Sequence, residues 1–335
     1  MSRWRIRNAV GLTLAAMIAI VTAAAIKSAS APVSASGLPS APVSATDFRA
    51  GAPQRHTEPI TPIPPASASQ SAKIALGELL FRDRRLSRYE SRSCASCHDI
   101  DDNGATHTSC DTSPDNRSRC FNTPTLFNAA LSFRFGWEGR FRTLEAQALD
   151  SLANPREMGA SLDEVVAKLN HDPAVTARFR EVYRRVANTK DLVNALAAFE
   201  RSLTTPDSRF DRWLAGEPGA LSEQELAGYR LFKSVGCISC HQGVNLGGNL
   251  FEKQGVFRPL AGPDPAMMRV PSLRNIAATA PYFHDGSAAS LEETVQRMAS
   301  AQLDAQLTPA QIDAIAAWMS TLTGNYRGRR ISAHP

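Results

Sequence analysis

Two copies of the pentapeptide C-x-x-C-H are the residues of this 335-residue chain whose types and spacing bear most directly on chemistry. They are Cys94, Cys97 and His98 in the first copy, and Cys237, Cys240 and His241 in the second copy, 143 positions later. Two thiols three positions apart can add to the two vinyl groups of one haem, and the adjacent histidine then lies under the iron as a ligand. The spacing therefore predicts two covalently attached haems of the c type.

Zinc sites and thiol–disulfide pairs also use pairs of cysteines, so both are alternatives to haem attachment. A four-cysteine zinc site usually brings its C-x-x-C pairs within about 20 residues, far closer than in this chain. A thiol–disulfide pair needs no histidine in the fifth position, and this chain has one in both copies. Both comparisons favour haem attachment.

Residues 1–31 have the features of an export signal. Arg3, Arg5 and Arg7 precede an apolar run over 9–26, and the tripeptide 29–31 fits the A-x-A pattern of a cleavage site. An uncleaved N-terminal anchor is the alternative, because a run of this length is at the edge of what spans a bilayer. Both interpretations place the rest of the chain outside the cytoplasm, in a bacterial periplasm.

The remaining two cysteines, Cys110 and Cys120, lie in a polar loop. In an oxidising compartment we expect them to form a disulfide that closes this short loop, with reactive thiols as the alternative.

Composition and charge exclude several classes of protein. With 43% apolar and 21% charged residues, the chain is neither disordered overall nor a multi-span membrane protein. The formal net charge of +5 would indicate nucleic acid or an anionic membrane as a partner. However, four of the 37 basic residues and no acidic residue lie in 1–31, so the remainder has a net charge of +1 before haem propionates are added. Nucleic acid is therefore not expected as a partner.

Beyond residue 71 the pattern is helical. Residues 32–71 are dominated by Ala, Ser and Pro, which predicts a disordered linker. Capping boxes or related starts at Ser161, Ser222, Ser290 and Thr308 then predict helices, while alternating strands are hard to find. Each C-x-x-C-H follows a predicted helix, over 73–81 and over 223–235. We expect an all-α fold of two domains, 72–205 and 206–335, with one haem each and a shared interface.

Seven stretches, in order, resemble the bacterial dihaem cytochrome c peroxidase family, which includes the MauG branch. They are N-T-P-T-L-F-N at 122–128, G-W-E-G-R at 136–140, L-E-A-Q-A from 144, N-P-R-E-M from 154, V-P-S-L-R-N at 270–275, A-P-Y-F-H-D-G at 280–286 and S-L-E-E-T-V-Q-R-M at 290–298. The resemblance spans about 72–323. It implies a peroxidatic haem at the first motif and an electron-accepting haem at the second.

The resemblance also implies roles for single residues. Met298 matches the axial methionine of the second haem; from periodicity alone it, Met267, Met268 and Met319 are typical core residues. Glu157 matches the acid–base catalyst, Gln147 a glutamine of the same pocket, and Trp137 the tryptophan between the haems. Asn122, Thr279 and Pro281 match the residues around a calcium ion, the last two through backbone carbonyls.

The chain departs from the family at the distal side of the first haem. Many members carry a distal histidine in the loop after the first motif, and the equivalent place here, near Pro114, has none. His107 is nearby, and it is either a distal ligand or a solvated loop residue. An open first haem resembles the MauG side of the family, whereas Met298 does not, because MauG itself has tyrosine at this ligand position.

Three functions follow. The first is a periplasmic peroxidase that reduces hydrogen peroxide to water with electrons from a small cytochrome c or a cupredoxin. The second is a MauG-like oxidase that stores two oxidising equivalents over both haems and oxidises a protein substrate. The third is a dihaem electron carrier, which would leave Glu157 and Gln147 without a purpose. Family resemblance also implies a homodimer. We expect the peroxidase.

Overall fold

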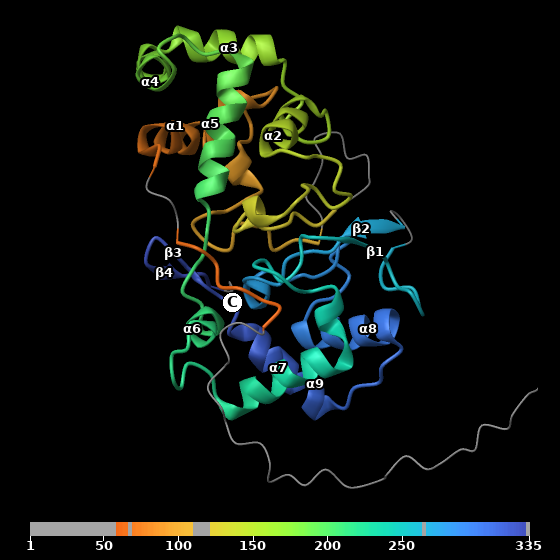
Figure 1. Ribbon diagram of the computed structural model, residues 1–335. Coiled ribbons are helices and arrows are strands. Elements are labelled where there is room, and N and C mark those ends of the chain that lie inside the picture. Colours follow the sequence, from red (N-terminus) through yellow and green to blue (C-terminus); the bar gives the residue numbers. More distant parts are fainter. Residues whose placement is uncertain (1–57, 66–68, 110–120, 263–265, 333–335) are drawn as a thin grey trace, which may run out of the picture. The chain divides into compact units, whose positions relative to one another are not determined.

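Helices dominate the regular structure, and strands are limited to two short hairpins (Figure 1). The computed structural model describes residues 58–65, 69–109, 121–262 and 266–332. The predicted signal segment 1–31, most of the predicted linker, and the predicted Cys110–Cys120 disulfide lie outside the described residues. Among the helices of the described ranges, none combines the length and apolar character that a membrane crossing needs.

Figure 1 shows α1 to α5 grouped in one half and α6 to α9 in the other. The helices are α1 (Ser71–Phe81), α2 (Leu144–Ala153), α3 (Leu162–His171), α4 (Pro173–Tyr183), α5 (Thr189–Ser202), α6 (Arg209–Leu214), α7 (Glu223–Val235), α8 (Leu291–Leu303) and α9 (Pro309–Ser320). Short 3-10 turns are η1 (Arg84–Leu86), η2 (Cys94–Ser96), η3 (Ala129–Leu131), η4 (Cys237–Ser239) and η5 (Ile276–Ala278). The antiparallel hairpins pair β1 (Phe251–Lys253) with β2 (Met267–Arg269), and β3 (Asn325–Tyr326) with β4 (Arg329–Arg330).

The predicted helix starts are confirmed by their caps. The hydroxyl oxygens of Ser161, Ser222, Ser290 and Thr308 each accept a hydrogen bond from the backbone N–H three residues later. Such a bond satisfies one of the free donors of the first helical turn. At Ser222 and Thr308 the reciprocal bond completes the capping box. The helix α4, which starts at Pro173, ends at Tyr183, because Arg184 adopts a left-handed conformation.

Each half has its own apolar core, built around one close pair of helices. In the first half α1 packs on α5, and in the second half α7 packs on α9. Gly77 and Gly228 make these approaches possible, because a Cβ at either position would overlap with the backbone carbonyl of Ala195 or Ala314 on the facing helix. The two halves thus use the same contact, a glycine on the first helix against backbone on the second.

Neither end of the described chain lies where the sequence analysis places it. Residues 58–65 lie within the predicted disordered linker, yet they lie against the second half, where Ile60 joins the apolar core. The Glu58 carboxylate accepts a hydrogen bond from the Tyr229 hydroxyl at 2.5 Å and pairs with Lys233. The disordered-linker prediction is therefore wrong for 58–65, because a few apolar and charged side chains there have specific partners.

The last residues of the described chain, assigned by sequence to the domain 206–335, pack on the first half. Ile331 joins the first apolar core, and the Tyr326 ring lies 5.0 Å from the Phe127 ring. Arg327 pairs with Glu78 on α1 at 2.6 Å. The C-terminal hairpin therefore holds the two halves together.

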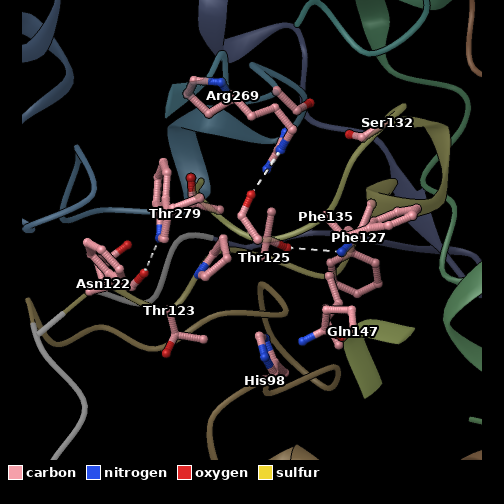
Figure 2. A pocket seen from close by; sticks show the side chains of 18 of the residues that line it. His98, Asn122, Thr123, Thr125, Phe127, Ser132, Phe135, Gln147, Arg269 and Thr279 are labelled. Carbon is pink, nitrogen blue, oxygen red and sulfur yellow. Dashed lines mark hydrogen bonds between the residues drawn. The ribbon is translucent and has the colours of Figure 1, made fainter. Parts of the chain in front are cut away.

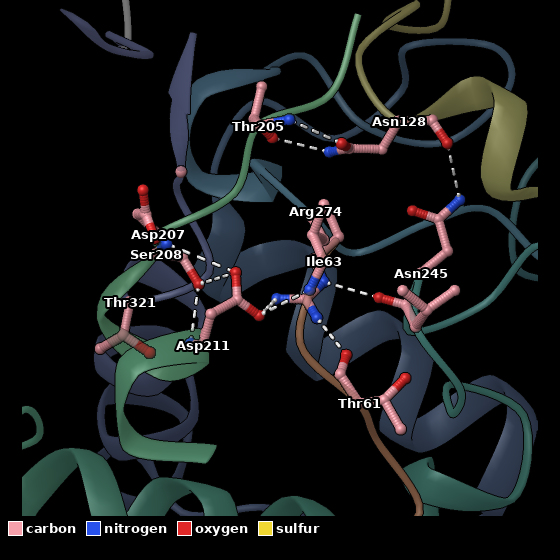
Figure 3. A network of polar contacts seen from close by, with 12 residues as sticks. Thr61, Ile63, Asn128, Thr205, Asp207, Ser208, Asp211, Asn245, Arg274 and Thr321 are labelled. Atoms are coloured by element: carbon pink, nitrogen blue, oxygen red, sulfur yellow. Dashed lines mark hydrogen bonds and ion pairs between the residues drawn. The ribbon is translucent and has the colours of Figure 1, made fainter. Parts of the chain in front are cut away.

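Buried polar side chains join the two halves further (Figure 3). Asn128 donates to the Thr205 hydroxyl at 2.7 Å, and Asn275 donates to the same oxygen at 2.9 Å. Deeper in the second half, the Arg274 guanidinium contacts Asp211 at 2.7 Å and donates to the backbone carbonyl of Thr61 at 2.9 Å. Because both charged groups are buried and hydrogen-bonded, the removal of either would leave an unpaired charge.

The glycine contact in the second half gives a direct stability prediction. Gly228→Ala should lower the free energy of unfolding by about 2 kcal/mol, because the added methyl overpacks a backbone contact between two helices. Chemical denaturation of the holoprotein measures this. Arg230→Ala, at an exposed position on the same helix, is the matched control and should change little. Equal stability of the two variants would contradict this packing account.

Candidate functional site: two C-x-x-C-H turns on one cavity

The two C-x-x-C-H motifs form the same local structure. The first cysteine of each motif begins a 3-10 turn, Cys94 in η2 and Cys237 in η4. In each motif the histidine N–H donates to the carbonyl of that first cysteine. These bonds measure 2.9 Å for His98 to Cys94 and 3.1 Å for His241 to Cys237. None of these four cysteines takes part in a disulfide within the described residues. The turn places Cys94, Cys97 and His98 of the first motif on one cavity, and Cys237 and His241 of the second motif line it too, whereas Cys240 does not.

Each motif histidine is held by a backbone carbonyl. The Nδ1 atom of His98 lies 3.3 Å from the Gly104 carbonyl oxygen, and that of His241 lies 3.1 Å from the Leu246 carbonyl oxygen. Burial lowers the pKa of both rings to about 4, so both are neutral at pH 7. A neutral ring that donates from Nδ1 leaves Nε2 free as a metal ligand. Both rings therefore suit axial ligation of haem iron.

One continuous cavity of about 1130 Å³ contains both motifs. Its lining is mainly apolar and comes from both halves, and it includes Cys94, Cys97 and His98 together with Cys237 and His241. Cysteine sulfurs beside a neutral, oriented imidazole are the donor chemistry that two c-type haems require. The residues present fit that group in both halves.

Nearly all the sequence-predicted site residues lie on this cavity. Its lining includes Asn122, Trp137, Gln147, Glu157, Thr279, Pro281 and Met298. Of the four methionines considered as thioether ligands, Met298 and Met319 line the cavity, whereas Met267 and Met268 do not. His107 is also outside its lining: it is exposed, with Nε2 2.7 Å from the Asp102 carboxylate, as is typical of a solvated loop residue.

Gln147 and Glu157 line the first half of the cavity. Figure 2 shows the Gln147 amide and the His98 imidazole pointing into the same part of it. Gln147 Nε2 donates to the Ser151 hydroxyl at 2.8 Å, and Asn154 Nδ2 donates to Glu157 Oε1 at 3.0 Å. The Glu157 side chain is exposed to solvent at this edge rather than enclosed in an apolar pocket. It can therefore exchange protons with water.

Trp137 connects the two halves. Its indole Nε1 donates to the Asn122 carbonyl at 2.8 Å, and its own carbonyl accepts from the Arg269 N–H at 3.0 Å. The Asn122 N–H in turn donates to the His284 carbonyl at 2.7 Å. His284 is buried beside the Phe121 ring and does not line the cavity. These bonds fix the tryptophan where residues of both halves meet.

Neutral oxygens are available beside Trp137 for a hard cation. The side-chain carbonyl of Asn122 and the backbone carbonyls of Thr279 and Pro281 accept no hydrogen bond within the described part of the chain. The described residues hold no cluster of three or more His, Cys, Asp or Glu side chains for a metal ion. Amide and carbonyl oxygens suit calcium, so the donor chemistry of these three residues fits the predicted ion.

Two residues on the cavity escaped the sequence analysis. Arg269 is only 9% exposed, and it has no carboxylate partner among the described residues. Its guanidinium donates to the carbonyl of Gly136 at 3.3 Å, and burial lowers its pKa to about 10. An uncompensated buried cation on this lining suits the propionates of a haem. No sequence pattern distinguishes Arg269 from other basic residues.

Glu200 on α5 is the second missed residue. It is buried on the cavity lining, and Oε2 has no hydrogen-bond partner among the described residues. Burial raises the pKa of this carboxyl to about 8, against a weaker opposite effect of Arg201. The signal in the sequence is an acidic residue directly after an apolar run that ends at Phe199.

The raised pKa of Glu200 predicts a pH-dependent stability difference. As pH rises from about 5 to 8, the unfolded chain loses this proton while the folded chain retains it, so the contribution to stability falls. Glu200→Gln should therefore become more stable relative to the natural protein over this range. Denaturation of both holoproteins at pH 5 and pH 8 tests this. Glu223→Gln, on an exposed position of α7, is the control. A stability difference that is independent of pH would refute the assignment.

Comparisons with known proteins match the whole helical part of the chain. A family model described as "Di-haem cytochrome c peroxidase" matches residues 71–219, and one described as "Cytochrome c" matches residues 226–323. A cytochrome c551 peroxidase of Nitrosomonas europaea is 37% identical over 286 residues, which cover 80% of this chain and 85% of that protein.

Two further comparisons support this match. The cytochrome c peroxidase Ccp of Escherichia coli is 37% identical over 293 residues, 82% of this chain and 63% of that longer protein. The solved structure of a MauG-like protein associated with microbial copper homeostasis aligns with a TM-score of 0.69 and 28% identity. That alignment covers 78% of this chain and 93% of the other.

Proposed function

Because the chain belongs to the di-haem cytochrome c peroxidase family, we propose that it reduces hydrogen peroxide to water in the half of the cavity that holds Cys94, Cys97 and His98. The observation that carries this proposal is an asymmetry of the cavity. A carboxylate and an amide, Glu157 and Gln147, line the first half, whereas Met298 lines the second.

Membership of the family confirms the resemblance that the motifs predict. The fold consists of two cytochrome c-like domains, the chain is an enzyme of the cytochrome c peroxidase class, and it carries two c-type haems. The domain boundary near 205–206 stays a prediction. Reduction of peroxide consumes two electrons and two protons and yields two water molecules, so the site must move protons as well as electrons.

A haem held by Cys94, Cys97 and His98 would supply the electrons and a binding position for the peroxide. Glu157 then takes the proton from the nearer oxygen of the peroxide and returns it to the departing oxygen, as an acid–base catalyst does. The Gln147 amide, held by Ser151, orients the peroxide by hydrogen bonding. Trp137, fixed to Asn122 and to the Arg269 backbone, offers an indole through which electrons pass between the halves.

In the second half we propose that the Met298 thioether on α8, together with His241, would hold the iron of the second haem. A thioether ligand raises the reduction potential of a haem, which suits a group that accepts electrons and passes them on. The electrons would come from a small cytochrome c or a cupredoxin. The chain would act in a bacterial periplasm after export by residues 1–31, and a homodimer is the proposed assembly.

The role of Glu157 is tested by its neutral isostere. Glu157→Gln keeps the shape of the side chain and removes the base, so turnover of peroxide with a reduced cytochrome should fall about 100-fold or more. The haem content should be unchanged. Glu181→Gln, on an exposed position of α4, is the control and should retain full activity. Normal turnover by Glu157→Gln would remove this residue from the mechanism.

The identity of the thioether ligand is tested by two matched variants, since both Met298 and Met319 line the cavity. Met298→Leu should abolish the near-infrared charge-transfer band of a His–Met haem and lower the midpoint potential of the second haem. Met319→Leu should preserve both properties. The opposite result would transfer the ligand role to Met319.

The calcium proposal rests on the oxygens of Asn122, Thr279 and Pro281, which accept no hydrogen bond from any residue that the structure describes. One bound calcium per chain is expected from metal analysis of the holoprotein, and its removal by a chelator should lower turnover because these oxygens flank the Trp137 contact. Added Ca²⁺ should restore the activity, and added Mg²⁺ should not, because Mg²⁺ demands a smaller octahedral site. A fully active protein without calcium would contradict the proposal.

One observation favours the MauG-like oxidase as a second candidate. Among the described residues, His98 and His241 are the only histidines on the cavity lining, so no described histidine is placed to cap the first haem. Peroxide could then react with the oxidised protein without prior reduction. Mössbauer spectra after addition of peroxide to the diferric protein separate the candidates. Storage of two oxidising equivalents without turnover of a reduced cytochrome would favour the oxidase.

A further inference from the structure

The two halves repeat one backbone pattern after their C-x-x-C-H motifs, at a constant offset of 147 residues. Asn128 and Asn275 both adopt a left-handed conformation, with φ of 62° and 60°, and each begins a three-residue 3-10 turn. Isolated bridges then join Phe135 to Phe141 and Tyr282 to Ala288. The helices α2 and α8 begin at Leu144 and Leu291, after caps at Thr143 and Ser290. These equivalent pairs define the register, that is, which residue of α2 corresponds to which residue of α8.

On this register Ser151 of α2 corresponds to Met298 of α8. Each lies seven residues after the first residue of its helix. Gln147 corresponds to Thr294 in the same way, and all four side chains line the cavity. Because equal positions in equivalent helices project to the same side, Ser151 is placed over the first half of the cavity as Met298 is over the second.

The contacts of Ser151 differ from those that a ligand would make. Its hydroxyl accepts the hydrogen bond from Gln147 Nε2 at 2.8 Å, one helical turn earlier. A serine side chain is too short to bring a donor atom to the place that a methionine sulfur reaches, and a hydroxyl is a poor substitute for a thioether. The position therefore holds the amide of Gln147 in place rather than binding iron.

We propose that Ser151 determines which of the two haems reacts with peroxide. At the ligand position of α2 it leaves the sixth site of the first iron open, and it positions the Gln147 amide beside that site. The inference rests on the proposed function, since it takes Met298 as the ligand of the second haem. Ser151 is thus a positioning residue. It holds the Gln147 amide in place, and it leaves the first iron open because it supplies no ligand.

The test is Ser151→Met in the full-length holoprotein, with Ser151→Leu as a control of similar bulk that lacks sulfur. In Ser151→Met, the first haem should lose its high-spin EPR signal and gain the near-infrared band of His–Met ligation. If the thioether leaves the iron open in about 1% of molecules, the apparent Kd for cyanide should rise about 100-fold. Ser151→Leu should keep the high-spin signal. A Ser151→Met protein that stays high-spin and binds cyanide like the natural protein would overturn the inference.

The reverse exchange keeps the inference falsifiable if Ser151→Met does not fold. Met298→Ser should make the second haem high-spin and able to bind cyanide, and a second haem that stays low-spin would contradict the register. These readouts are independent of turnover. If the natural protein has one open and one His–Met haem but reduces no peroxide with a reduced cytochrome, the proposed function fails while the role of Ser151 in ligation stands.

Discussion

A hydrogen bond from a buried imidazole to a backbone carbonyl, made once in each half, is the interaction on which the rest of the site depends. The carbonyls of Gly104 and Leu246 hold the rings of His98 and His241 in one orientation, and burial keeps both rings neutral. Without this bond the thiols of each motif would still be close together, but Nε2 would have no fixed direction. The tight C-x-x-C-H turns and the helices behind them serve this geometry.

On this shared scaffold, function arises from the few positions at which the halves differ. The helices α2 and α8 present Ser151 and Met298 at equivalent places. A second pair of positions differs in the same way. Gly77 contacts Ala195 on α5, and Gly228 contacts Ala314 on α9. Five residues after these alanines, α5 has Glu200 and α9 has Met319, and both side chains line the cavity. In both comparisons the first half has a polar side chain where the second has a thioether. A polar pocket suits proton-coupled chemistry on peroxide, and a methionine-lined pocket suits electron transfer.

Much of this structure could be predicted from the sequence because its determinants are local. A C-x-x-C-H turn and a capping box each depend on residues within five positions of one another, and the structure has them where the sequence predicts. Residues 58–65 could not be predicted in this way, because their partners, such as Tyr229 and Arg274, lie more than 160 positions away. The shifted pKa values of Glu200 and Arg269 result from burial, and the sequence does not show that these two residues are buried. The equivalence of Ser151 and Met298 is hidden in the sequence, because equivalent residues of the two halves are 143 positions apart at the C-x-x-C-H motifs but 147 positions apart in α2 and α8.

The central claim is that two similar pockets hold one open haem and one haem closed by a thioether. The EPR spectrum of the fully oxidised, unmodified holoprotein tests it most directly. The structure predicts one high-spin signal from the haem at His98 and one low-spin signal from the haem at His241, in equal amounts. Two low-spin signals and no high-spin signal would contradict it, since the first iron would then have a ligand that none of the described side chains is placed to supply.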